Sequence, residues 1–364
     1  MKVQDVMDHM ETLAPLADSE DFDNTGLLIG DPQMEVTGVL VTLDTLEIIV
    51  DEAIDAGCNL IVSFHPIIFK GLKSITGKNY VERVVMKALA NKIAIFAIHT
   101  ALDNAWHGVN GEICNRLGLN DRSMLIPKAG SILKLTTFVP KEAAENVRTA
   151  LFEAGAGAIG NYDHCSFNID GTGTFNGNGE SNPTKGEKGT IQQEEEVQIG
   201  VVLEARLKGR VMKSLMQAHP YEEVAYELIT LNNANQKLGM GMIGSLPNEM
   251  DEQAFLKLLK TTFKSGCIKH SALRGKKVNK VAVLGGSGAF AIGAAKAAGA
   301  DFYVTADLKY HDFFQAEGQL VLADIGHYES EQFTKDLIVA HLSKKFTNFA
   351  LVLSQKNTNP ITYY

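Results

Sequence analysis

The chain has 364 residues, which exceeds the usual size of one domain, so we expect two domains that each bury a core. Its hydrophobic share of 45% and charged share of 21% are ordinary for globular proteins and exclude a disordered or fibrous chain. The net charge of -9, with no block of lysine and arginine, disfavours nucleic acid as a partner, because an acidic surface repels phosphate backbones.

The N-terminal segment predicts a cytoplasmic protein. Residues 1–8 (MKVQDVMD) carry acids where a signal peptide needs an apolar core, and no apolar run along the chain is long enough to span a bilayer. The four cysteines lie far apart without a Cys-x-x-Cys pair, which indicates reduced thiols rather than a disulfide framework. We therefore expect no membrane partner.

The first third of the chain alternates β-branched apolar runs with amphipathic stretches. Residues 38–44 (GVLVTLD) predict a buried strand, residues 46–56 a helix ended by Gly57, and residues 60–64 and 93–99 two further strands. This β-α-β rhythm is typical of a parallel sheet covered by helices, so the predicted fold class is α/β.

The middle of the chain follows a different order. Between residues 131 and 231 the pattern predicts strand 133–139, helix 141–153, strand 163–169, strand 196–203, helix 207–218 and strand 224–231. This is the βαββαβ order of a ferredoxin-like domain. Residues 171–189, rich in Gly, Asn, Thr and Lys, predict a long mobile excursion between two of its strands.

The first rhythm returns near the C-terminus, with strands at 280–284, 302–305 and 320–323 and a helix at 292–298. We therefore predict a discontinuous α/β core of residues 1–128 and 238–364, interrupted by an inserted domain of residues 129–237. Two separate α/β domains are the alternative.

Polar side chains follow the predicted strands at their carboxyl ends, where ligands bind in open parallel sheets. In chain order these ends carry Asp44; His65; His99 and Asp103; the run Gly285-Gly286-Ser287-Gly288; Asp307 and His311; and Asp324, His327 and Glu331. Imidazoles and carboxylates are ligands that Zn²⁺, Mn²⁺ or Fe²⁺ accept, and no cysteine set competes with them. The sequence thus predicts a metal site that leaves room for water, as catalytic sites do.

We assign the metal to four of these residues, His65, Asp103, His327 and Glu331. Each also has an ordinary structural interpretation. His65 precedes a proline and would then end a strand, Asp103 would cap a helix, and His327 with Glu331 would form a solvated i,i+4 pair.

A dinucleotide site is the rival interpretation. Residues 286–291 fit the form Gly-x-Gly-x-x-Ala through Gly286 and Gly288, and Asp307 follows the next strand, where a ribose-binding acid is expected. The pattern is weak, because glycine-rich turns after strands serve tight packing more often than cofactors.

The same residues carry a resemblance to a known family. The matching segments are residues 22–30 (FDNTGLLIG), 63–70 (SFHPIIFK), 99–103 (HTALD), 285–288 (GGSG), 305–311 (TADLKYH) and 324–331 (DIGHYESE). In combination they resemble the Nif-three-like family, whose bacterial members are often named GTP cyclohydrolase 1 type 2 homologues.

The resemblance implies a dinuclear metal centre between two related α/β halves, and a homo-oligomer in the form of a ring-shaped hexamer. Longer members insert a domain similar to the PII and cation-tolerance proteins, to which residues 219–223 (HPYEE) would belong; otherwise these residues are a loop entering the last inserted strand. By carry-over, His65, Asp103 and Glu331 would surround one metal and His327 the other, with Glu331 bridging.

Two positions depart from the family pattern. Phe64 stands where the family has the first histidine of His-His-Pro, so the second metal has lost an imidazole. Ala306 replaces the glycine of Thr-Gly-Asp, which can alter the turn.

The resemblance favours a metal-dependent hydrolase acting on a nucleotide, as a GTP cyclohydrolase would, or on a phosphoester. Asp307, His311 or Glu329 would then move the proton. The alternative is a non-enzymatic metal-binding or regulatory ring whose insert senses a small molecule. The lost imidazole at Phe64 favours this alternative.

Overall fold

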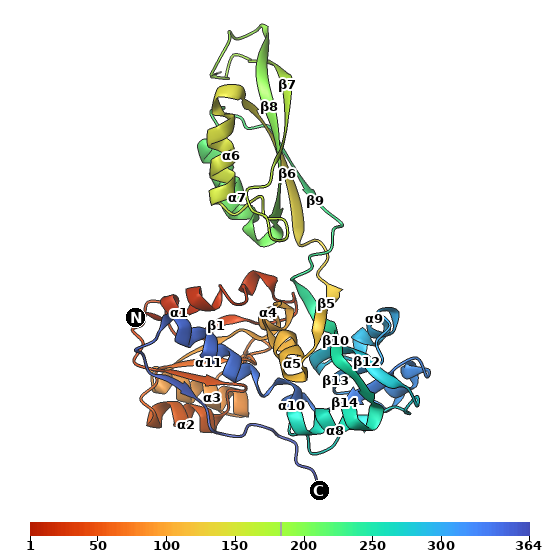
Figure 1. Ribbon diagram of the computed structural model, residues 1–364. Helices are drawn as coiled ribbons and strands as arrows, with labels where there is room; N and C mark the ends of the chain where they lie inside the picture. Colours follow the sequence, from red (N-terminus) through yellow and green to blue (C-terminus); the bar gives the residue numbers. More distant parts are fainter. Residues whose placement is uncertain (183) are drawn as a thin grey trace. The chain divides into compact units, whose positions relative to one another are not determined.

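The computed structural model describes residues 1–182 and 184–364, which form two compact units (Figure 1). The first unit joins Met1–Pro127 to Gln236–Tyr364, and the second consists of Lys128–Asn235. In the described part of the chain, no helix combines the length and apolarity needed to cross a bilayer.

A five-stranded sheet forms one half of the first unit, in the order β1-β4-β3-β2-β15. Its strands are β1 (Gly26–Ile29), β2 (Val39–Thr42), β3 (Leu60–Ser63), β4 (Ala94–Ala97) and β15 (Leu351–Leu353). All but β1 run parallel, and every residue of β2, β3 and β4 is buried, as expected for a sheet covered on both faces.

Helices cover both faces of this sheet. Side chains of α2 (Glu47–Asp55) and α3 (Tyr80–Ala90) pack with alternate strand residues such as Leu40 and Ile61. The intervening residues, such as Val41 and Val62, face a larger core that includes α1 (Val3–Met10) and α11 (Thr334–Lys345). The short helices η1 (Leu16–Asp18), α4 (His99–Asn104) and α5 (Val109–Leu117) complete this half.

A six-stranded sheet forms the other half, in the order β11-β14-β13-β12-β10-β5. Its strands are β5 (Asn120–Pro127), β10 (Gly239–Asp251), β11 (Lys269–His270), β12 (Lys277–Ser287), β13 (Phe302–Ala306) and β14 (Val321–Asp324). Only β12, β13 and β14 are mutually parallel. The helices of this half are α8 (Glu252–Thr262), η4 (Ala289–Ala291), α9 (Ile292–Ala297), η5 (Tyr310–Ala316) and α10 (His327–Glu331).

The two halves exchange strands. β5 belongs to the N-terminal part of the chain but lies at the edge of the second sheet, and β15 from the C-terminal end pairs with β2 of the first. Since α5 also packs on β10 and β12, the discontinuous segments form one unit. The carboxyl ends of β2, β3, β12, β13 and β14 all lead into the candidate site described below.

The second unit is a four-stranded antiparallel sheet in the order β7-β8-β6-β9. It consists of β6 (Ile132–Pro140), η2 (Lys141–Ala143), α6 (Ala144–Glu153), β7 (Phe167–Asn176), β8 (Ile191–Glu204), η3 (Ala205–Leu207), α7 (Lys208–Ala218) and β9 (Tyr226–Thr230). Both long helices pack on one face of the sheet (Figure 1).

The predicted excursion at residues 171–189 is wrong for its first six residues. Gly171 to Asn176 continue β7 and pair with residues 191–196 of β8. Strand pairing uses backbone groups, so glycines and small polar residues can extend a hairpin without the apolar alternation that marks a strand in the sequence. Residue 183 of this segment lies outside the described residues.

Candidate metal centre

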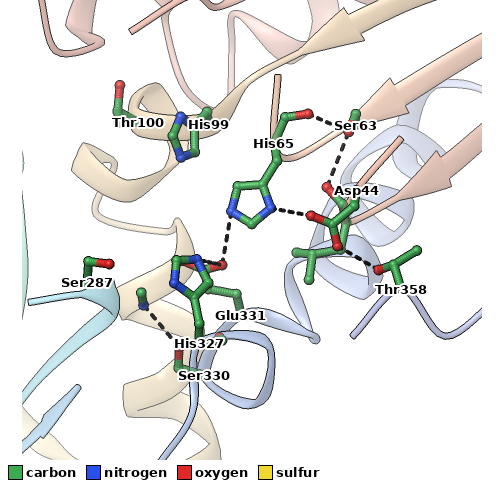
Figure 2. A network of polar contacts seen from close by, with 12 residues as sticks. Asp44, Ser63, His65, His99, Thr100, Ser287, His327, Ser330, Glu331 and Thr358 are labelled. Carbon is green, nitrogen blue, oxygen red and sulfur yellow. Dashed lines mark hydrogen bonds and ion pairs between the residues drawn. The ribbon is translucent and has the colours of Figure 1, made fainter. Parts of the chain in front are cut away.

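Two imidazoles and one carboxylate converge where the two sheets of the first unit meet (Figure 2). The Nε2 atoms of His65 and His327 lie 3.2 and 3.1 Å from Oε2 of Glu331. His65 follows β3, whereas His327 and Glu331 occupy the two ends of α10, one helical turn apart. The ligand atoms of all three lie within 4.8 Å of one another.

The contacts of Glu331 suit a bound cation. Its side chain is buried, and Oε2 receives no hydrogen bond of normal geometry from any described residue, although both imidazoles are close. Two nitrogen or oxygen ligands that sit about 2.0–2.1 Å from one tetrahedral zinc ion are about 3.3 Å apart. The observed separations are close to this value, so the three side chains could hold a divalent ion.

Each imidazole is oriented by an aspartate on its other nitrogen. Nδ1 of His65 lies 2.8 Å from Oδ1 of Asp44, and Nδ1 of His327 lies 2.7 Å from Oδ2 of Asp307. Asp44 in turn accepts a hydrogen bond of 2.6 Å from Thr358 (Figure 2). A carboxylate on Nδ1 fixes the tautomer that leaves Nε2 available for a metal, as is usual for metal-bound histidines.

A third histidine faces the same space. The ring of His99 lies 5.2 Å from that of His65, and its Nδ1 lies 2.9 Å from Oδ1 of Asp23. Burial alone would raise the pKa of Asp23, but hydrogen bonds from His99 and Thr100 outweigh it and lower the pKa to about 2. The sequence interpretation missed these histidine–aspartate pairs, although Asp44 ends a strand and Asp23 lies in a matched segment.

Asp103, the fourth predicted ligand, is not part of this converging group, but it is close enough to interact electrostatically with Glu331, His65 and His327. Its Oδ1 is enclosed without a hydrogen-bond partner among the described residues. Burial and the negative charge of Glu331 raise the pKa of Asp103 well above its usual range. A second enclosed and unpaired carboxylate oxygen is again the pattern that a bound cation would relieve.

The negative charge of Glu331 lies between the two imidazoles and affects the pKa of each. Burial opposes the charged form of His65, but Glu331 and Asp44 outweigh it and raise the pKa to about 10. Asp307 and Glu331 likewise raise the pKa of His327 to about 11 against burial. Glu331 is buried, yet the two imidazoles lower its pKa to about 2.

The three proposed proton carriers are placed differently. Asp307 is engaged by His327 and by the hydroxyl of Ser287, next to the centre. His311 is exposed on η5, where its ring contacts Tyr310 and Phe314.

Glu329 points elsewhere, because its buried carboxylate accepts a hydrogen bond of 3.2 Å from Asn359 in the C-terminal tail. The structure therefore brings only Asp307 to the centre, and it does so as a partner that positions His327.

The glycine-rich turn after β12 is explained by close packing. Gly286 has φ +71°, and a Cβ there would overlap Oε1 of Glu331. A Cβ at Gly288 would overlap the hydroxyls of Thr305 and Tyr303. These contacts account for the glycines without a dinucleotide, and the proposed ribose-binding Asp307 is already paired.

Phe64 lies in the core next to the centre. Its side chain is fully buried, and its ring centroid lies 4.8 Å from that of His65 and 5.4 Å from that of His99. The apolar ring thus occupies space beside two imidazoles.

A cavity of about 250 Å³ opens beside the centre. Its lining includes His99, Asp103, His327 and Glu331, together with two exposed aromatic side chains, Phe22 and Phe290. The lining therefore combines charged groups with apolar rings.

Comparison with known proteins identifies the family. The model of the family Duf34/NIF3 (NGG1p interacting factor 3) matches residues 1–360. The chain belongs to the DUF34/NIF3 family. It is 36% identical over 367 residues to the GTP cyclohydrolase 1 type 2 homolog of Bacillus subtilis and 37% identical over 366 residues to that of Halalkalibacterium halodurans, covering 99% of this chain and 98% of each relative.

Two solved structures are similar over the full length of the chain. A Bacillus cereus protein related to NIF3 has a TM-score of 0.84 and 37% identity, covering 100% of this chain and 99% of that one. The Staphylococcus aureus protein SA1388 has a TM-score of 0.78 at 29% identity, with the same coverage. For a DUF34/NIF3 member, the converging His65, His327 and Glu331 are therefore the possible metal site.

Proposed function

We propose that this chain binds one or two divalent metal ions, with zinc as the first candidate and manganese or iron as alternatives, and that it acts as a metal-dependent hydrolase. The ligands would be His65, His327 and Glu331, with Asp103 completing the set. The observation that carries the proposal is the buried Oε2 of Glu331, which faces two oriented imidazoles and has no hydrogen bond of normal geometry.

A divalent ion held there would polarise substrate oxygens and lower the pKa of water. The surrounding residues would orient the histidines and transfer a proton. Asp44 and Asp307 keep Nε2 of the two histidines directed at the centre. His99, with Nδ1 paired to Asp23, is the imidazole in the cavity lining that would exchange a proton with substrate.

The substrate would be a nucleotide, as the names of the relatives suggest for GTP, or another phosphoester. The exposed rings of Phe22 and Phe290 would contact a planar base, since aromatic rings stack on such groups. A cavity of 250 Å³ would hold only part of a nucleotide, with the remainder outside it.

The test begins with metal analysis of the full chain purified without chelator. His65→Ala and Glu331→Ala should each lower bound metal per chain, whereas His311→Ala, at an exposed histidine away from the centre, should not. Unchanged metal content in both ligand variants would remove the proposal. Reconstituted protein is then screened against GTP, other nucleotides and bis-p-nitrophenyl phosphate.

The second candidate function is a non-enzymatic, metal-binding regulatory assembly, which Phe64 favours because an apolar ring stands in place of an imidazole. Metal binding without metal-dependent turnover in the screen would support it.

For either function we propose that the chain assembles into a homohexameric ring. We also propose that residues 128–235 form an inserted ferredoxin-like, PII-like module, and the antiparallel strand order β7-β8-β6-β9 supports this relation.

A further inference from the structure

The second unit contains a cavity of about 580 Å³ that the metal centre does not use. Phe138, Ile169 and Gln198 line it from one row of directly paired strand positions. Their neighbours in sequence, such as Val139 and Ile199, face the opposite way into the core with α6 and α7. The cavity therefore lies on the sheet face that these helices leave uncovered.

Two glycines shape the floor of the cavity. Along β7, Ile169, Gly171, Gly173 and Phe175 are each two positions apart, so their side-chain positions share one face of the strand. A Cβ at Gly171 would meet nothing within 4 Å, and a Cβ at Gly173 would overlap the carboxylate of Glu196. Glycine weakens a strand interior and often marks close approach of a ligand. Here the glycines open space where side chains would otherwise stand.

A tyrosine–glutamate pair forms the polar wall. The Tyr221 hydroxyl donates a hydrogen bond of 2.8 Å to Oε1 of Glu196. Burial and the neighbouring Glu196 raise the pKa of Tyr221, so the hydroxyl remains a donor. Among the described residues, no hydrogen bond or ion pair engages the second carboxylate oxygen of Glu196. The Tyr221 and Phe175 rings lie 6.5 Å apart.

Two hydrogen bonds of His219 hold the loop that carries Tyr221. This buried imidazole accepts a hydrogen bond of 3.1 Å from the Tyr221 backbone on Nδ1 and donates one of 2.9 Å from Nε2 to the Phe138 carbonyl. The segment at residues 219–223 is thus held against β6 and presents Tyr221, Glu222 and Glu223 to the cavity.

The cavity lining is acidic. Its charged members are Asp170, Glu196, Glu222, Glu223 and Lys185. Lys185 is already bound by two carboxylates, at 2.5 Å from Glu142 and 2.6 Å from Glu194. An anion would therefore meet uncompensated negative charge, whereas a cation would be attracted.

We propose that this cavity binds a small organic amine, a ligand with one ammonium group and an apolar body. The ammonium would hydrogen-bond to Glu196, and its body would lie over the glycine floor between Phe138, Ile169 and Phe175. The volume is in the range of small-molecule sites, and aromatic rings beside a carboxylate attract organic cations. All the lining residues belong to the second unit, so the proposal does not depend on the metal centre.

The experiment uses the full chain and the matched probes phenethylamine and 3-phenylpropanoate, which have similar bodies but opposite charge. Binding is measured by saturation-transfer and chemical-shift titrations. Wild type should bind phenethylamine and not 3-phenylpropanoate. Glu196→Gln keeps an acceptor for Tyr221 but removes the charge, and should weaken phenethylamine binding about ten- to a hundredfold.

The matched control is Glu195→Gln, the same change one residue away on the opposite face of β8, where Glu195 is exposed and pairs with Lys141 at 3.3 Å. It should bind phenethylamine as wild type does. Gly171→Leu should block the floor independently. Any of three results would overturn the proposal: wild type binds no phenethylamine at a concentration of about 10 mM, which is on the order of the weakest fragment affinities; both probes bind equally; or Glu196→Gln binds phenethylamine as tightly as Glu195→Gln does.

Discussion

At the scale of single residues, the three histidines of the centre share one arrangement. His65, His99 and His327 each place Nδ1 within hydrogen-bond distance of an aspartate, so each Nε2 remains available. The aspartates come from segments remote in sequence from their partners, by 21, 76 and 20 positions. Orientation of the imidazoles is therefore a product of the tertiary fold.

The first prediction concerns Asp44. Asp44→Ala should lower metal affinity about 10- to 100-fold, because His65 loses the carboxylate that fixes its tautomer. Asp51→Ala, at a surface residue that pairs with Lys87, is the control and should have no effect. Calorimetric titration of zinc into the metal-free proteins measures both, and equal affinities for Asp44→Ala and wild type would contradict the orienting role.

The second prediction concerns Phe64. Phe64→His should add a ligand beside His65 and His99 and strengthen binding of a second metal by about one to two orders of magnitude. If the new imidazole instead stays in the closed apolar space, an unsatisfied nitrogen should cost about 1–3 kcal/mol of folding stability. Metal titration and thermal unfolding separate the two outcomes, and unchanged stoichiometry and affinity would mean that the second site has been lost.

The third prediction is a pH dependence. Glu331 with Asp44 raises the pKa of His65 to about 10, and Asp307 with Glu331 raises that of His327 to about 11, so we expect metal binding at neutral pH to release two protons. The apparent Kd should therefore fall by up to about 100-fold per pH unit between pH 6 and 8. Calorimetry in buffers of different ionisation enthalpy counts the released protons; release of none would contradict the protonated centre.

The same raised histidine pKa values affect the folding stability of the metal-free protein, which should decrease as pH rises, whereas metal affinity should increase. A raised histidine pKa contributes stability that is fully present below the unfolded value near 6.5 and is lost as pH rises through 10 to 11. The metal-free chain should thus become less stable on alkalinisation while the metal-bound chain does not.

At the scale of elements, the sequence located the parallel strands and the chemistry at their ends. The apolar runs at residues 60–64 and 320–323 correspond to β3 and β14, and their carboxyl ends lead to His65 and to His327 with Glu331. The exchange of β5 and β15 between the sheets could not be predicted, because periodicity reports burial and not which distant strand is the neighbour.

The turn after β12 gives the fourth prediction. Gly286→Ala should displace the Glu331 carboxylate and lower metal content, because Gly286 has φ +71° and its Cβ would overlap Oε1 of Glu331. The left-handed backbone adds about 1–2 kcal/mol of strain. Gly293→Ala in α9, where a Cβ meets nothing within 4 Å, is the control and should bind metal normally. Full metal content in Gly286→Ala would show that the backbone of the turn can shift without displacing the Glu331 carboxylate.

At the scale of the molecule, the proposed ligands come from both halves of the first unit. His65 follows a strand of the first sheet, and His327 with Glu331 follows a strand of the second. A metal bound only by the folded arrangement should raise stability by RT ln(1 + [metal]/Kd), which is about 2.7 kcal/mol at a hundredfold excess over Kd. The strand exchange and the centre would then stabilise the same assembly of halves.

The last prediction concerns the independence of the second unit. Pro127 at the end of β5 is paired with Gly239 at the start of β10, so the chain leaves and re-enters the first unit through neighbouring antiparallel strands. Replacing residues 128–235 with a short Asn/Gly linker should therefore close a β-hairpin and leave a folded core. This shortened chain should keep the zinc affinity of the full chain and lose phenethylamine binding. Insoluble or metal-free product from several linker lengths would mean that the first unit needs the second to fold.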